Sequence, residues 1–135
     1  MKILYNNIMK KYIAIDYGEK RTGIALSDEA GMVFPYKVVN TFLIFKTIEE
    51  LLSKEKYDGI IVGNPMIGKR KGMIEKFINS LKEMFNIEVI EWDESCTTKI
   101  ADDYLRKIGE KAAKRRKKVD KIAACIILEE FLFSN

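Results

Sequence analysis

The sequence predicts an α/β domain built on a mixed five-stranded sheet, and three observations support this. Two strand-like runs, 12–15 and 22–27, are separated by a glycine-containing turn. A continuously apolar run, 57–63, follows an amphipathic helical pattern, as expected of a strand buried on both faces and parallel to its neighbours. A second helical pattern and a further strand-like run, 87–92, repeat the alternation.

The first half of the chain predicts a three-stranded meander followed by a helix. Gly18 allows the turn of the opening hairpin. The third strand-like run, 32–39, contains Pro35, which cannot donate a backbone hydrogen bond and therefore favours the edge of a sheet. The first helix is predicted from apolar residues at helical spacing, namely Ile44, Phe45, Ile48, Leu51 and Leu52.

The second half predicts a basic loop, 64–72, and then a helix with its apolar face on Ile74, Phe77, Ile78, Leu81 and Phe85. Right-handed crossovers place the fourth and fifth strands beside the first and parallel to it, which gives the strand order 3-2-1-4-5. The rest of the prediction is a third helix over 100–108, capped by Thr97 or Thr98 and stopped by Gly109, a mobile basic loop over 109–118, and a final helix over 119–133.

Length and composition predict one globular domain, 1–135. The chain has 135 residues, of which 47% are hydrophobic and 33% charged. No apolar stretch reaches the roughly 20 residues that a membrane-spanning helix needs, so we expect a cytoplasmic protein. Residues 1–10 are a candidate leader, with Met9 as an alternative start. Cys96 and Cys125 are far apart and are expected to be free thiols.

The absence of histidine narrows the chemistry. It removes the usual general base, the common zinc ligand and every nucleophile activated by histidine. Hydrolysis would have to rely on carboxylates, lysines or a metal bound through oxygen ligands. The expected cofactor is therefore Mg²⁺ or Mn²⁺.

Three carboxylates are predicted to meet at one edge of the sheet. Asp16 ends the first strand, Glu94 follows the fifth, and Asp120 begins the last helix. The carboxyl ends of parallel strands share one edge, where ligands bind in open α/β sheets. Each acid also has a structural interpretation, as a turn residue, a surface residue or a helix cap, and Asp93 competes with Glu94 for the inward position. Three clustered carboxylates suit a two-metal site for phosphodiester hydrolysis.

Two basic runs favour nucleic acid as a partner, although a solvated charged face is the alternative for each. The net charge is +4, and the positive residues are concentrated in Lys69-Arg70-Lys71 and in a segment that contains Lys111, Lys114, Arg115, Arg116, Lys117 and Lys118.

Four ordered motifs resemble the YqgF or RuvX family of Holliday junction resolvases, whose fold is RNase H-like (RuvC-like), over 12–133. They are Asp-x-Gly-x-Lys-Arg-x-Gly at 16–23, Gly-x-Pro at 63–65, Asp-Glu-x-x-Thr-Thr at 93–98 and Val-Asp-x-x-Ala-Ala at 119–124. The resemblance implies that Asp16, Glu94 and Asp120 form an acidic triad that binds Mg²⁺ or Mn²⁺ for nuclease chemistry.

The resemblance also suggests further contacts and substrates. Lys20 and Arg21 match the family's basic pair and are expected to contact phosphate. The chain departs from the family pattern at Ser95, where arginine is common, and at Asn64, where leucine is common; Asn64 is a candidate polar contact beside the metals. The implied substrate is either a four-way DNA junction or the 5′ end of pre-16S ribosomal RNA.

The leading hypothesis is therefore a metal-dependent endonuclease that acts on structured nucleic acid, as a monomer or a homodimer. A non-catalytic nucleic-acid-binding or ribosome-associated module with the same fold is the second hypothesis. A sugar-kinase-like or actin-like phosphate-binding half ranks last, because the chain is too short for two lobes that enclose a nucleotide.

Overall fold

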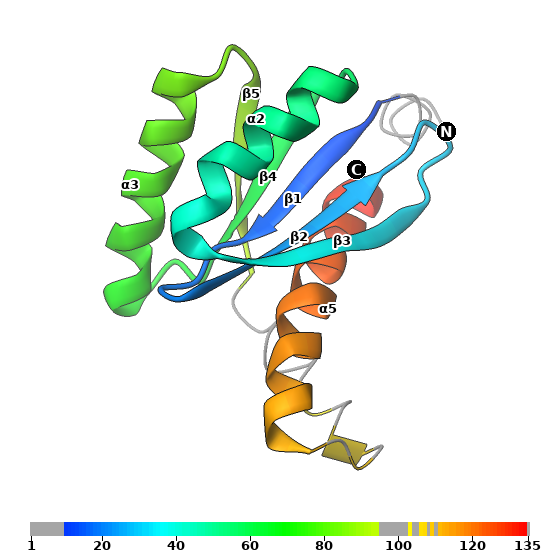
Figure 1. The fold of residues 1–135 in the computed structure, drawn as a ribbon, viewed down its shortest axis with the longest axis vertical. Coiled ribbons are helices and arrows are strands. Elements are labelled where there is room, and N and C mark those ends of the chain that lie inside the picture. The colour runs from blue at the N-terminus through cyan, green and yellow to red at the C-terminus, as the bar shows by residue number, and fades with distance from the viewer. Residues whose placement is uncertain (1–9, 95–102, 104–105, 108, 110, 135) are drawn as a thin grey trace.

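The computed structural model describes residues 10–94, 103, 106–107, 109 and 111–134, with only the backbone for 112–121. Figure 1 shows one sheet with helices on both faces. The elements are β1 (Tyr12–Asp16), β2 (Arg21–Ser27), β3 (Val33–Asn40), the 3₁₀ helix η1 (Thr41–Leu43), α2 (Ile44–Lys54), β4 (Gly59–Asn64), α3 (Gly68–Met84), β5 (Glu88–Asp93) and α5 (Ala112–Phe133).

The sheet has the order β3-β2-β1-β4-β5, which confirms the predicted order. β1 pairs antiparallel with β2 and parallel with β4, and β4 pairs parallel with β5. β3 lies at the edge, as Pro35 predicts, and the pairing register shifts where Pro35 faces Ala25. β1, β4 and β5 therefore end at the same edge of the sheet.

The sheet separates two apolar cores. Ile13 and Ile15 of β1 pack in the core shared with α2 and α3, whereas Tyr12 and Ala14 pack in the core shared with α5. This alternation follows from the two-residue period of a strand, and it accounts for the burial of every β1 residue. In Figure 1 the first half of α5 extends past the sheet on the side where β1 ends.

Both basic runs that we expected in loops lie in helices, which corrects the prediction. α3 begins at Gly68, so the run 69–71 forms its first turn, and α5 begins at Ala112, so 112–118 are helical and not a mobile loop. Lysine, arginine and alanine are good helix formers, so such runs can be helical without apolar periodicity. Gly72, which suggested a loop, lies inside α3 with open space around it.

Several predictions fall outside the described residues. These are the candidate leader up to residue 9, Ser95, Cys96, the caps Thr97 and Thr98, and most of the helix predicted over 100–108. Gly109 is described and has a φ of +78°, as a helix stop there requires. Cys125 is a free thiol, and burial raises its pKa to about 11. No described helix is long and apolar enough to span a membrane.

Candidate active site

Asp16 is a buried carboxylate at the carboxyl end of a central strand. It is the last residue of β1, and only 6% of its surface is exposed. It shares the strand face of Tyr12 and Ala14, which pack toward α5. The strand that buries Ile13 and Ile15 on one face thereby aims this acid along the opposite face, at the edge where β1, β4 and β5 end.

Glu94, and not Asp93, is the acid that points inward after β5. Glu94 is 4% exposed, whereas Asp93 is exposed to solvent. Its backbone N–H donates to the Asn64 carbonyl oxygen at 3.0 Å, which extends the pairing of β5 with β4 by one residue. Both carboxylate oxygens are buried, and neither accepts a hydrogen bond from a described residue. Burial raises the pKa of Glu94 against the opposing effect of Arg70, and Asp93 and Glu130 raise it further.

Gly63 of β4 provides the space that the Glu94 carboxylate occupies. A Cβ atom at Gly63 would lie 3.1 Å from both Cδ and Oε2 of Glu94 and 2.6 Å from Cδ1 of Ile127 in α5. β4 lies between β1 and β5, so the missing side chain lets Glu94 lie over β4 on the face that carries Asp16. A larger residue would displace Glu94 or separate α5 from the sheet.

Replacement of Gly63 by alanine is therefore expected to destabilise the protein by about 1–3 kcal/mol, as overpacking of a closed core does. Urea denaturation measures the loss. Gly72→Ala is the matched control, because that Cβ would meet nothing within 4 Å in α3 and a helical alanine is favoured. A Gly63→Ala protein as stable as the wild type would show that the core tolerates the methyl group.

Arg70 joins the two acids. Its Nη2 atom lies 3.7 Å from Oδ1 of Asp16 and 3.8 Å from Oε1 of Glu94. Both distances are too long for hydrogen bonds, and the same nitrogen instead donates to the Tyr17 carbonyl oxygen at 2.9 Å. Two acids from β1 and β5 thus face one cationic group from the first turn of α3. The side chain of Arg70 is 43% exposed, so solvent screens this attraction.

Asn64 holds the turn that leads to α3. Its side chain is fully buried, its amide nitrogen donates to a carboxylate oxygen of Glu91, and its Oδ1 accepts the N–H of Met66 at 2.9 Å. Met66 has a φ of +71°, an uncommon conformation that this bond supports. The hydrogen bonds of the Asn64 side chain therefore give it a structural role in this turn. Its contact with nucleic acid stays a prediction.

The remaining predicted site residues differ in how much of them the structure describes and in how exposed they are. Asp120 is in α5, the helix on the Asp16 face, but its side chain is outside the described residues, as are those of Lys114, Arg115, Arg116, Lys117 and Lys118. Lys20 is exposed at the hairpin tip and Arg21 is half-buried at the start of β2. Lys69 and Lys71 are exposed beside Arg70. Within the described part of the chain, no group of three acidic, cysteine or histidine residues is placed to hold a metal.

Sequence reasoning missed two features of this site. Arg70 was expected to contact nucleic acid. Its position beside Asp16 and Glu94 was not predicted, because nothing in the basic run distinguishes it from Lys69 and Lys71. The role of Gly63 could have been predicted from the sequence, because a glycine inside a buried strand often marks a place where another group approaches the backbone closely.

Comparison with known proteins identifies the family. The sequence profile of the family described as "RuvX: Holliday junction resolvase" matches residues 10–134. The chain belongs to the RuvX family. This membership confirms the resemblance that the four motifs predicted.

Two curated relatives of this RuvX chain carry the name "Putative pre-16S rRNA nuclease". The protein of Fusobacterium nucleatum subsp. nucleatum is 39% identical over 134 residues, which cover 92% of this chain and 97% of the relative. That of Malacoplasma penetrans is 36% identical over 139 residues, covering 96% and 98%. The relatives align over nearly their whole length.

A solved structure supports the RNase H-like fold. The fowlpox virus Holliday junction resolvase superposes on this RuvX chain with a TM-score of 0.51 and 16% sequence identity, covering 93% of this chain and 99% of the viral one. At this identity the likeness concerns the fold. Together with the strand order, it confirms the predicted fold class.

Proposed function

We propose that this chain is a divalent-metal-dependent endonuclease that hydrolyses phosphodiester bonds of structured nucleic acid. One observation carries the proposal: strands β1 and β5 bring Asp16 and Glu94 to the same guanidinium, and Glu94 is buried with no hydrogen bond from a described residue. A buried carboxylate that accepts no hydrogen bond is costly, and proteins retain such groups where they bind a cation or react. Membership of a resolvase family supports nucleic acid as the substrate.

The donor set fits Mg²⁺ or Mn²⁺. Both ions prefer oxygen ligands, and the chain has no histidine to favour zinc. Asp16 and Glu94 would hold the metal, and Asp120 of α5 would complete the acidic triad. When bound, one or two such ions supply a water of lowered pKa and neutralise charge on the phosphoryl oxygens.

The chain's own residues bind and position the substrate. Burial of Glu94 excludes water from its carboxylate and fixes its orientation. Lys20 at the hairpin tip and Lys69 in the first turn of α3 are exposed on either side of Tyr17, where they attract phosphates. Arg70 offsets the charge of the two acids when no metal is bound and is a further candidate contact for phosphate.

Replacement of Arg70 by glutamine is expected to tighten Mn²⁺ binding about three- to tenfold, because one positive charge within 4 Å of both acids is removed. Calorimetric titration of Mn²⁺ into the two proteins measures the change. Lys69→Gln is the matched control, since it removes the same charge from the adjacent exposed position. Equal tightening in both variants would assign the effect to net charge and remove Arg70 from the site.

The proposal is tested by incubating the protein with a four-way DNA junction and, separately, with a 5′-extended 16S rRNA precursor. We expect one of these substrates to be cut in Mg²⁺ and neither in EDTA. Salt-sensitive binding of both without metal-dependent cleavage would contradict the proposal and favour a non-catalytic binding module. Because both candidate substrates are intracellular nucleic acids, we also propose a cytoplasmic location.

A further inference from the structure

A shallow aromatic trough lies on the face of the sheet that α2 and α3 cover, opposite the face that carries Asp16 and Glu94. Two adjoining hollows of about 500 and 550 Å³ form it. Tyr17 and Phe45 line both hollows, so the two share a wall, and we call the pair the trough. Tyr17 directly follows Asp16 in the chain, and its carbonyl oxygen accepts the hydrogen bond from Arg70. Tyr17 therefore connects the trough to the candidate active site through its backbone, while its ring lies on the other face of the sheet.

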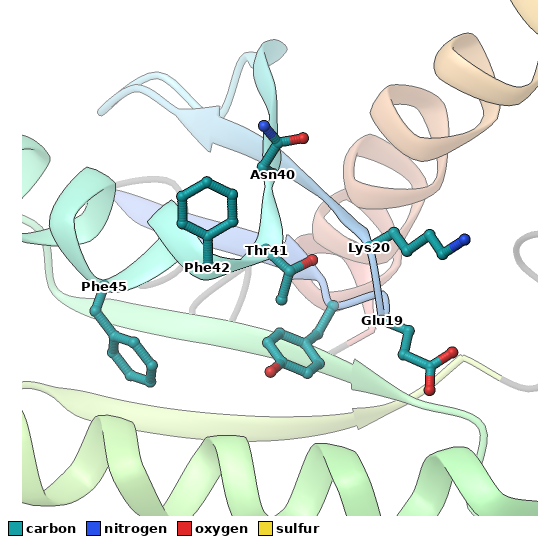
Figure 2. A pocket seen from close by; sticks show the side chains of 7 residues that line it. Glu19, Lys20, Asn40, Thr41, Phe42 and Phe45 are labelled. Atoms are coloured by element: carbon teal, nitrogen blue, oxygen red, sulfur yellow. The ribbon is translucent and has the colours of Figure 1, made fainter.

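The first hollow has an exposed aromatic ring on one side and charged residues on the other. Figure 2 shows Phe42 and Phe45 on one side of this hollow, with their rings pointing in different directions, and Glu19 and Lys20 on the hairpin on the other side, with their side chains pointing away from the rings. Phe42 is 82% exposed, more than any other large hydrophobic residue that the structure describes. An exposed aromatic ring at the rim of a hollow is available to stack on a flat ligand.

The walls of the first hollow are held together by Thr41. Its hydroxyl donates to the Gly18 carbonyl oxygen at 2.7 Å and lies 2.9 Å from the Thr22 hydroxyl. Its backbone N–H donates to the Lys20 carbonyl oxygen at 2.9 Å. These bonds tie η1, which carries Phe42, to the hairpin tip, so the hollow is formed before any ligand arrives.

The floor of the trough is a packed aromatic cluster. Tyr17 stacks on Phe77 with ring centroids 4.0 Å apart and planes at 18°, and Phe45 meets Phe77 at 5.5 Å. These three rings are fixed by each other and by the core. Phe42 is not among the residues of this core cluster, and its ring is exposed.

The second hollow adds positive charge. One face of α3 lines it, with Lys69, Met73, Lys76 and Ser80 at spacings of three and four residues. The whole trough is lined by three lysines and one glutamate, counting Lys20 and Glu19 of the first hollow. Its surface therefore complements a polyanion that carries flat apolar groups.

We propose that this trough binds an unpaired nucleotide of the substrate, with its base stacked on Phe42 and its phosphates facing the lysines. This inference rests on the proposed function and narrows its substrate class: the nucleic acid presents a single-stranded segment to the face of the sheet that α2 and α3 cover. Aromatic rings combined with cationic side chains are the means by which proteins hold single strands without reading their sequence.

The test is equilibrium binding of a short single-stranded oligonucleotide that contains the fluorescent base 2-aminopurine, measured in EDTA. We expect binding to quench the fluorescence and Phe42→Ala to weaken the affinity about 5- to 100-fold. The salt dependence of binding should keep its slope, because no charge is lost. Phe42→Tyr, which keeps an aromatic ring, should restore most of the affinity.

Phe133→Ala is the matched control, because Phe133 is also an exposed phenylalanine, 66% exposed, at the end of α5. Equal affinities of Phe42→Ala and wild-type protein, or binding without quenching, would overturn the proposal. The assay needs no metal and no cleavage. An inactive protein that still stacks the base would refute the proposed function alone, and an active protein without the Phe42 effect would refute the trough alone.

Discussion

The Asp16→Asn protein is expected to lose at least about 10³-fold in kcat/KM for metal-dependent cleavage, because we propose that Asp16 is a charged metal ligand at the centre of the site. The substitution keeps the size of the side chain, so the buried position should still be filled and the fold retained. Affinity for the uncut substrate, measured in EDTA, should change little. Initial cleavage rates in Mg²⁺, with binding measured in parallel, separate the two effects.

Asp58→Asn is the control for this variant. Asp58 lies just before β4, at the opposite end of the strand from Asn64, and accepts a hydrogen bond from the backbone N–H of Lys11 at 2.8 Å. It should retain cleavage close to the wild-type rate. Comparable activity of Asp16→Asn and Asp58→Asn proteins would remove Asp16 from the catalytic site.

The Glu94→Gln protein is expected to lose cleavage to a similar extent and to be more stable than the wild type when no metal is present. In EDTA the gain in the free energy of unfolding should be about 1 kcal/mol, because a buried charge without a hydrogen bond from a described residue is replaced by a neutral amide. Loss of activity with a gain in stability is typical of a functional residue and not of a structural one.

The gain should depend on pH with a defined sign. Burial raises the pKa of Glu94 in the folded protein, so the folded state holds its proton more tightly than the unfolded state does. Wild-type stability is therefore retained below the unfolded pKa and falls as pH rises through the folded pKa. The difference between Glu94→Gln and wild type should grow over that window and then level off, as urea denaturation in EDTA between about pH 4 and pH 8 would show.

Asp93→Asn provides the control for Glu94→Gln, since Asp93 is the adjacent acid and is exposed. Its stability difference from the wild type should be small over the same pH range. A Glu94→Gln protein that is less stable than the wild type at every pH would show that the carboxylate supports the fold.

The sheet and its order follow from the sequence because they depend on buried residues. Continuous apolar runs give β1 and β4, and right-handed crossovers leave one arrangement for the parallel strands. Pro35 marks the edge strand for a local reason, the missing N–H. The positions of Asp16 and Glu94 at one edge follow from the same rules, because each residue comes at the end of a parallel strand.

Other features are set by tertiary contacts that the sequence pattern does not carry. The basic first turn of α3 faces solvent, and the basic run of α5 has no apolar periodicity, so the sequence pattern does not indicate that either is helical. The choice between Asp93 and Glu94 depends on the space above Gly63, which exists only once β4 lies between its neighbours. The placement of Arg70 over both acids depends on the turn that Asn64 and Met66 form before α3.

The central proposal is that Asp16 and Glu94 hold a divalent metal. Electron paramagnetic resonance, which detects the binding of Mn²⁺ directly, tests this without any substrate. We expect wild-type protein to bind Mn²⁺, and Asp16→Asn and Glu94→Gln each to weaken its affinity by at least about tenfold, whereas Asp58→Asn leaves it unchanged. Equal affinities for Mn²⁺ in the wild type and in both site variants would contradict the account.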